Sequence, residues 1–230
     1  MSYQLRRKAA KIDLLLEEVY GVPQLEKNVN VLDELILTLL SHNTNDINRD
    51  KGYNELRKQY PTWEKVIAAP RKKIENAIRI AGLAPAKSGY IKDTLNFIKD
   101  NWGELNIDWI CDKDPEWVEE TFTQVKGIGV KTINVVLSFA CGSDRFPVDT
   151  HINRICARLG FVPNGSSPEK TYIAMSTIFP KGKAYPFHLN IITHGREICK
   201  ARNPLCDKCN LKRFCRYYKE VVKPAQSFAH

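Results

Sequence analysis

Four cysteines near the C-terminal end have a spacing that suits a metal centre. They follow the pattern C-x6-C-x2-C-x5-C, from Cys199 through Cys206 and Cys209 to Cys215. Four thiolates within 17 residues require a metal ion or a cluster to balance their charge. Zinc prefers two short pairs, whereas only one pair is close here. The spacing therefore favours a [4Fe–4S] cluster and leaves zinc as the alternative.

The other three cysteines, Cys111, Cys141 and Cys156, show no such pattern. An odd total of 7 cysteines argues against a disulfide framework. We therefore expect these three side chains to be buried apolar thiols.

A glycine-rich turn between two expected helices could hold a phosphate. Gly127 and Gly129 flank Ile128, so the backbone can turn sharply and approach a ligand closely. The helix that follows would point its free N–H groups and the positive end of its dipole at that ligand. Ile128 would pack between the two helices and fix the turn. The alternative is a tight helical hairpin whose glycines only satisfy geometry.

Two side chains near this turn could perform chemistry. Lys131 would lie in the first turn of the second helix, where apolar neighbours and the helix dipole favour a neutral, nucleophilic amine. The alternative for Lys131 is an exposed, solubilising lysine. Asp149 stands at a loop-to-helix junction, where it is a candidate base or electrostatic stabiliser. The alternative for Asp149 is a helix N-cap.

Helices must position these groups, because the helical periodicity of apolar residues runs through almost the whole chain. Apolar residues between Val31 and Leu40 form a core-facing stripe, and Asp114-Pro115-Glu116 is typical of a helix start. Alternating strand patterns with hairpin turns are missing, so we predict an all-α fold. Further helices are expected near residues 5–20, 46–60, 63–69, 71–81, 86–100, 130–140, 151–160, 168–179 and 185–199.

The charge of the chain favours a polyanionic partner. The net charge is +9, and eight basic residues against two acidic ones between Cys199 and Lys223 account for +6 of it. Apolar runs are far too short to cross a membrane, and the N-terminal segment does not have the pattern of a signal peptide. We therefore expect an intracellular, soluble monomer of the cytoplasm, nucleoid or nucleus.

The hairpin with Lys131, the Val148-Asp149-Thr150-His151 segment and the cysteine tail, in this order, resemble the endonuclease III family. These proteins are DNA glycosylases of the helix–hairpin–helix superfamily, and the resemblance runs from about residue 30 to residue 217. It implies a six-helix barrel of residues 32–142, with the helix–hairpin–helix at about 115–140. Residues 1–31 and 143–230 would form an iron–sulfur cluster domain, with its cluster loop at 199–215. DNA would bind in the cleft between the domains, where Lys131 and Asp149 would meet.

Two shorter segments also match loops of the family. Asn43 stands where a glutamine usually fills the space left by the extruded base, and His42 precedes it. Leu83 stands where the family has a wedge that enters the base stack; the alternative is a core leucine. Lys87 would hold a phosphate or cap its helix.

The resemblance also implies a set of phosphate contacts. The cluster would be structural and would support a basic loop from Lys200 to Leu205, which includes Arg202. His42 and His151 would be polar packing residues or phosphate contacts, and Lys126 adds positive charge beside the hairpin.

The activity that the resemblance implies is that of a bifunctional DNA glycosylase and AP lyase. Its partner would be double-stranded DNA with a damaged or mismatched base, in the family usually a pyrimidine. Lys131 would displace the base and form a Schiff base, with Asp149 assisting, and β-elimination would then cut the strand. The alternatives are a monofunctional glycosylase with an Asp149-activated water, and a non-catalytic, structure-specific DNA-binding module.

Overall fold

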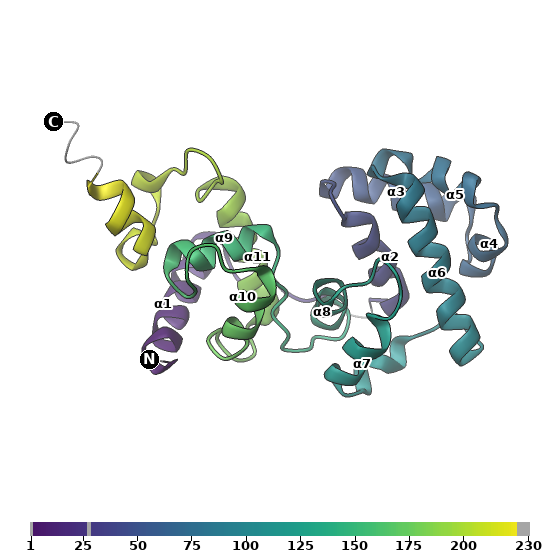
Figure 1. Cartoon of the computed structure of the whole chain (residues 1–230), viewed down its shortest axis with the longest axis horizontal. Helices are drawn as coiled ribbons and strands as arrows, with labels where there is room; N and C mark the ends of the chain where they lie inside the picture. The colour runs from purple at the N-terminus through teal and green to yellow at the C-terminus, as the bar shows by residue number, and fades with distance from the viewer. Residues whose placement is uncertain (1, 27–28, 225–230) are drawn as a thin grey trace. The chain divides into compact units, whose positions relative to one another are not determined.

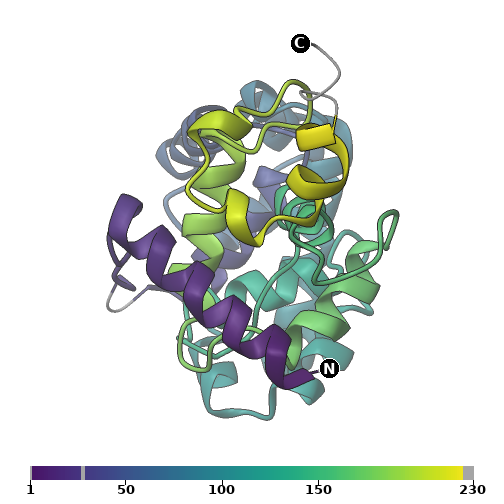
Figure 2. The same cartoon turned by 90° about the vertical axis from the view of Figure 1, so that its left-hand side faces the viewer.

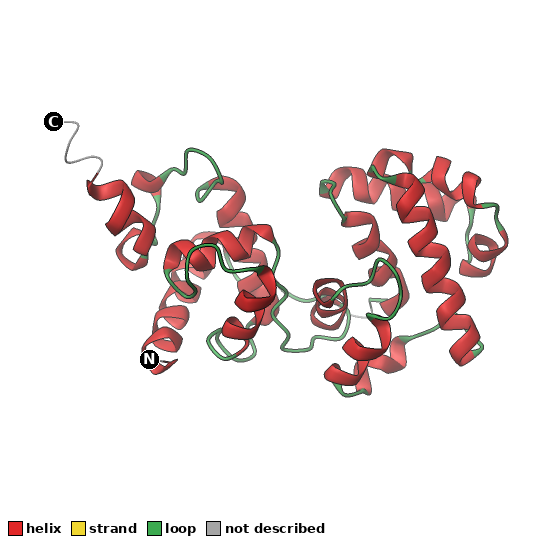
Figure 3. Cartoon of the chain, in the orientation of Figure 1, coloured by secondary structure: helices red, strands yellow, loops and turns green. Residues whose placement is uncertain are grey.

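The computed structural model describes residues 2–26 and 29–224, and within these ranges it contains helices and loops without any strand (Figure 3). The all-α prediction is confirmed. The chain forms two compact units. We call Glu26–Cys141 the central unit, and Met1–Leu25 together with Gly142–His230 the terminal unit. Across the described residues, no helix is long and apolar enough to span a lipid bilayer.

The central unit is built around α2, whose apolar stripe is buried. Leu32, Leu35, Ile36 and Leu39 of this helix are fully inaccessible to solvent. Helix α2 packs against α3, α6 and α8 (Figure 1). The elements of this unit are α2 (Val31–Ser41), α3 (Asp46–Gln59), α4 (Trp63–Ala68), α5 (Arg71–Ala77), η1 (Arg79–Ala81), α6 (Ala84–Trp102), η2 (Asp108–Asp112), α7 (Pro115–Phe122) and α8 (Val130–Phe139).

Side-chain caps fix where several of these helices begin. Asn30, Asn45 and Thr62 each accept a hydrogen bond from the backbone N–H three residues further on, at the starts of α2, α3 and α4. Asp114 does the same for α7, with Pro115 at the first helical position. The helix start predicted at Asp114 is therefore confirmed.

The terminal unit joins the two ends of the chain. Helix α1 packs against α11, although the whole central unit separates them in sequence (Figures 1 and 2). Ile12, Leu16, Phe146 and Phe187 belong to its buried core. The elements are α1 (Ser2–Tyr20), α9 (Thr150–Leu159), α10 (Pro168–Ser176), α11 (Ala184–Glu197), and the short turns η3 (Cys206–Lys208), η4 (Lys212–Phe214) and η5 (Tyr218–Val222).

Two of the three cysteines outside the C-terminal cluster differ from prediction. Cys111 and Cys141 are not buried thiols but form a disulfide with an S–S distance of 2.07 Å. The fold brings η2 next to the end of α8, and a sequence separation of 30 residues hides this proximity. Cys156 is fully buried and free, as predicted.

Candidate functional site

The hairpin between α7 and α8 depends on Gly127. Its φ of +95° lies in the left-handed region that favours glycine. A Cβ at this position would lie 2.4 Å from Cγ of Tyr90 in α6, so the backbone rests directly on the tyrosine ring. Ile128 is 4% exposed and belongs to the core of the central unit, as predicted. The turn is therefore held from both sides.

Gly129 has a different environment from Gly127. It is the N-cap residue of α8, with an extended backbone (φ −108°, ψ 172°) that any residue adopts. A Cβ added there would meet nothing within 4 Å. The geometry of the turn therefore explains Gly127 but not Gly129, and Gly129 leaves open space in front of the first N–H groups of α8.

Lys131 lies in the first turn of α8 and is exposed. The partial desolvation expected from its apolar sequence neighbours is not found, because Val130 beside it is also exposed. The burial of the helix begins at the next residue, Thr132, which is 3% exposed. The observed exposure of Lys131 agrees with the alternative given for it, an exposed lysine side chain. Lys126, before the hairpin, is exposed as well.

His42 connects the end of α2 to the beginning of α8. Its Nε2 lies 3.2 Å from Oγ1 of Thr132, the residue after Lys131. Burial lowers the pKa of His42, and the positive charges of Lys131 and Lys87 lower it further. The imidazole is therefore neutral near pH 7 and acts as a polar packing group, one of the two roles expected for it.

Two exposed residues with left-handed backbone lie in the loops that follow α2 and η1. Asn43 has φ +51° and is exposed. Leu83 has φ +50°, follows Gly82 with φ +69°, and is 55% exposed. The alternative of a core leucine at position 83 is therefore wrong. Both side chains are available to a partner.

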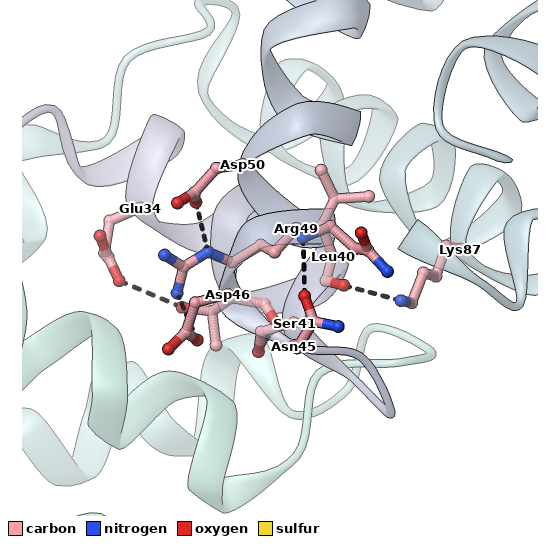
Figure 4. A network of polar contacts seen from close by, with 10 residues as sticks. Glu34, Leu40, Ser41, Asn45, Asp46, Arg49, Asp50 and Lys87 are labelled. Atoms are coloured by element: carbon pink, nitrogen blue, oxygen red, sulfur yellow. Dashed lines mark hydrogen bonds and ion pairs between the residues drawn. The ribbon is translucent and has the colours of Figure 1, made fainter. Parts of the chain in front are cut away.

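Lys87 does not have the position expected of a phosphate-binding residue. It is 1% exposed, and its amine donates hydrogen bonds to the carbonyl oxygens of Leu40 and Ala81, each at 2.7 Å. Figure 4 shows the amine pointing to the Leu40 carbonyl at the end of α2. Burial lowers the pKa of Lys87 to about 8. Two helix-end carbonyls hold the amine inside the unit, so the expectation of a phosphate contact is corrected.

In the terminal unit, Asp149 is the N-cap of α9. Its Oδ1 accepts a hydrogen bond from the N–H of Ile152 at 2.8 Å, which fixes the orientation of the carboxylate. Oδ2 makes no hydrogen bond to the described part of the chain. The capping role that we gave as the alternative is thus present, and it leaves the second carboxylate oxygen available for another role.

His151, two residues further on, is held by Arg154. The guanidinium lies 3.2 Å from Nδ1 of His151. Burial lowers the pKa of His151. Arg154 also donates to the carbonyl of Cys199 at 3.0 Å. The start of α9 is therefore connected to the first cysteine of the C-terminal pattern.

The four cysteines of the C-x6-C-x2-C-x5-C pattern all line one pocket. Arg158 donates to Sγ of Cys199 at 3.3 Å, and the N–H of Tyr218 donates to Sγ of Cys215 at 3.4 Å. Burial, together with the neighbouring thiolates, raises the pKa of Cys209 to about 11. The thiolate forms of these side chains would therefore need the positive charge of a metal ion or cluster in the pocket. Among the described residues, no group of three side chains has metal-binding geometry. The chemistry of the four cysteines, soft sulfur donors that accept N–H hydrogen bonds, fits a cluster.

The basic loop after Cys199 is supported by Arg158. The guanidinium donates to the carbonyls of Lys200 at 2.7 Å and Ala201 at 3.0 Å. Asn203 has a left-handed backbone, with φ +49°. The side chains of Lys200 and Arg202 are exposed. One arginine therefore contacts both the first cysteine and the loop that carries these charges.

The predicted site residues divide between the two units. The central unit contains the hairpin, Lys131, the residues of the two exposed loops and Lys87. The terminal unit contains Asp149, His151, the cysteines and the basic loop. Sequence reasoning missed Tyr90, Thr132, Arg154 and Arg158, which support these residues. Of these four, only Thr132 could have been found from the sequence, because it directly follows Lys131.

Comparisons with known proteins identify the family of this chain. The model of the HhH-GPD superfamily of base excision DNA repair proteins matches residues 36–181. Endonuclease III of Sulfolobus acidocaldarius is 35% identical over 227 residues, which cover 94% of this chain and 98% of that protein.

Solved structures show the same relationship. A non-covalent complex of endonuclease III with DNA has a TM-score of 0.81 and 27% identity, covering 95% of this chain and 98% of that one. A trapped covalent endonuclease III–DNA intermediate, an estranged-adenine complex, has a TM-score of 0.80 and 28% identity, covering 96% and 99%. The chain therefore belongs to the HhH-GPD superfamily and is a base-excision DNA repair enzyme of the endonuclease III type, the class of DNA glycosylases and AP lyases.

Proposed function

We propose that this chain is a bifunctional DNA glycosylase and AP lyase that acts on double-stranded DNA with a damaged or mismatched base. The observation that carries the proposal is the exposed Lys131 amine directly behind the open Gly129 turn. DNA phosphate would approach the first N–H groups of α8 at Gly129. The same approach would bring the sugar of an extruded nucleotide to Lys131.

The proposed chemistry needs an amine and a carboxylate. The Lys131 amine attacks C1′ of the deoxyribose, and the bond from C1′ to the base breaks as the base leaves. Asp149, through Oδ2, stabilises the positive charge that develops on the sugar, and it then accepts the proton that the amine loses as the bond to C1′ forms. The base leaves with the bonding electron pair and takes up a proton from water. Ring opening then gives an imine between Lys131 and C1′, and loss of the proton on C2′ expels the 3′ phosphate by β-elimination.

Recognition of the damaged base would involve the two exposed loops. Leu83 would enter the base stack as a wedge, and Asn43 would fill the space opposite the extruded nucleotide. Oxidised or mispaired pyrimidines are the proposed substrates. Asn43 is one methylene shorter than glutamine, so the preferred opposite base depends on this position. The enzyme is proposed to act as a monomer.

The four cysteines are proposed to hold a [4Fe–4S] cluster. When bound, the cluster supplies a crosslink between segments of the C-terminal tail. Arg158 connects this site to the loop with Lys200 and Arg202, which would contact phosphates. Iron and sulfide in a 1:1 ratio with visible absorption would support the assignment, whereas a colourless protein with one zinc ion would overturn it.

The test of the activity is borohydride trapping on duplexes that carry single lesions. The wild type should form a covalent adduct, Lys131→Ala should form none, and Lys99→Ala, an exposed lysine of α6, should form the adduct as before. Release of the base with an intact strand and no adduct would identify a monofunctional glycosylase. Binding of lesion DNA without release of any base would identify a non-catalytic DNA-binding module.

A further inference from the structure

Lys87 lies where two loops of the central unit begin. Its amine donates to the carbonyl of Leu40, near the end of α2, and to the carbonyl of Ala81, at the end of η1. Leu40 is 47 residues away from Lys87 in sequence, and Ala81 is six residues away. The carbonyls at helix ends lack a partner within the helix. A single ammonium group therefore caps two helices at once.

Each capped helix leads into a loop that carries an exposed side chain. Asn43 lies three residues after Leu40, and Leu83 lies two residues after Ala81. Both have a left-handed backbone, with φ of +51° and +50°. Their orientation therefore depends on how the preceding carbonyl is held, because the backbone turns within three residues of it.

The support of Lys87 itself is firm. Lys87 lies in the first turn of α6, where its N–H donates to the carbonyl of Leu83 at 3.0 Å. Arg71 of α5 donates to the carbonyl of Pro85 and to Oγ of Ser88, at 2.5 and 3.3 Å. The start of α6 is therefore fixed to its neighbour, and Lys87 extends from a fixed point to both loops.

The Lys87 amine does more than fill space in the core. A buried ammonium loses its hydration, and burial is the cause of its lowered pKa. Replacement of the amine by an apolar side chain would leave the carbonyls of Leu40 and Ala81 without this donor, which costs stability. The amine does what an apolar side chain cannot: it binds both carbonyls simultaneously and sets the distance between them.

We propose that Lys87 is a positioning residue that couples the loop carrying Asn43 to the loop carrying Leu83, so that both side chains enter the duplex as one unit. This proposal rests on the proposed function of a base-extruding enzyme. The wedge Leu83 and the space-filling residue Asn43 would then act on the same nucleotide step. A shift in one loop would be transmitted to the other through Lys87.

The test is a double-mutant cycle of Asn43→Ala and Leu83→Ala, measured as the single-turnover rate of base release. In the wild type the two effects should be non-additive by roughly fivefold or more. In a Lys87→Met background, which retains the length of the side chain but not its donors, they should become additive within about twofold. Lys92→Met is the matched control. Lys92 lies in the same helix and donates to a helix-end carbonyl, that of Ala69, away from both loops, so its removal should leave the coupling intact.

Several outcomes would overturn the proposal. Additive effects of Asn43→Ala and Leu83→Ala in the wild type would overturn it even if Lys87→Met failed to fold. Lys87→Gln, which retains one donor group, provides a second background. Coupling that persists in the folded Lys87→Met protein would also do so. The same cycle measured as affinity for a duplex with a tetrahydrofuran site does not require catalysis. Coupling in affinity without any base release would contradict the proposed function while leaving the role of Lys87 standing.

Discussion

The ring of Tyr90 lies where a side chain at Gly127 would project, 2.4 Å from the ideal Cβ position to Cγ. Glycine is therefore required at 127 by contact and by its φ of +95°. Two residues further on, Gly129 has neither constraint. The two glycines of one hairpin thus serve different purposes, and substitution separates them.

Gly127→Ala should destabilise the central unit by about 2 to 4 kcal/mol, because the new methyl group overlaps Tyr90 and the left-handed backbone becomes strained. Gly129→Ala should leave stability within about 0.5 kcal/mol, since its methyl group occupies open space. It should nevertheless weaken DNA binding, because the methyl group stands where a phosphate approaches. Urea unfolding and binding of an undamaged duplex measure the two effects. Unchanged affinity in Gly129→Ala would argue against a phosphate at this turn.

Asp149→Asn should separate the two roles of this side chain. An asparagine oxygen can still cap α9, as Asn30 and Asn45 cap other helices of this chain, so thermal stability should stay close to that of the wild type. The rate of base release should fall about 100-fold or more, because the charge and the proton acceptor are lost. Asp149→Ala should lose about 1 kcal/mol in addition.

Asp114→Asn is the control, since Asp114 caps α7 by the same type of bond. It should affect neither stability nor rate. A full rate in Asp149→Asn would leave Asp149 as a cap alone.

Local signals predicted most of the helices correctly, because caps and apolar stripes act within one or two turns. Asp114 marks the start of α7, and the stripe of α2 is buried as its spacing indicates. The segment 71–81 was predicted as one helix but divides into α5 and η1. Helix ends depend on contacts that such patterns do not contain.

The errors at the site arose from long-range contacts. The partners of Lys87 include a carbonyl 47 residues away, so its burial left no local trace. Lys131 has apolar neighbours in sequence, yet the buried face of α8 begins after it, at Thr132. Cys111 and Cys141 are joined across 30 residues, and the odd cysteine count argued against the bond.

The Cys111–Cys141 disulfide encloses the entire helix–hairpin–helix segment. Closing a loop of 30 residues restricts the unfolded chain, which corresponds to about 3 to 4 kcal/mol of stability. The double variant Cys111→Ser/Cys141→Ser should therefore unfold at lower urea concentration than the oxidised wild type.

Reduction of the wild type should produce the same shift and should have no effect on the double variant. Mass spectrometry after alkylation of the unfolded, unreduced protein should show two thiols protected. A protein with no protected pair would contradict the disulfide.

Glu34 in α2 should make stability depend on pH. Burial raises the pKa of its carboxyl group from 4.5 to about 7, against the opposing effects of Thr38 and Arg49. Between these pH values the folded state binds a proton that the unfolded state has lost. Stability should therefore fall as the pH rises through this window, by at most about 1.4 kcal/mol per pH unit.

Glu34→Gln should remove this dependence, so the variant should gain stability relative to the wild type as the pH increases from 4.5 to 7. The difference between the two unfolding free energies isolates Glu34 from other titrating groups. A difference that is constant with pH would contradict the raised pKa. Figure 4 shows Glu34 in the polar network with Asp46, Arg49 and Asp50. Glu120→Gln, on the exposed surface of α7, is the control.

Lys200 and Arg202 should contribute to DNA affinity only through salt-dependent contacts with phosphates. Each phosphate contact releases condensed counterions, so the slope of log K against log salt is about −0.9 per contact. Lys200→Ala/Arg202→Ala should therefore make the slope about 1.8 less negative, provided that both side chains contact phosphates. Lesion preference should not change, because phosphate contacts carry no base information. Lys170→Ala, an exposed lysine of α10, is the control and should leave the slope unchanged. A double variant with the wild-type slope would show that the loop after Cys199 does not contact the duplex, and the charge of the tail would then need another partner.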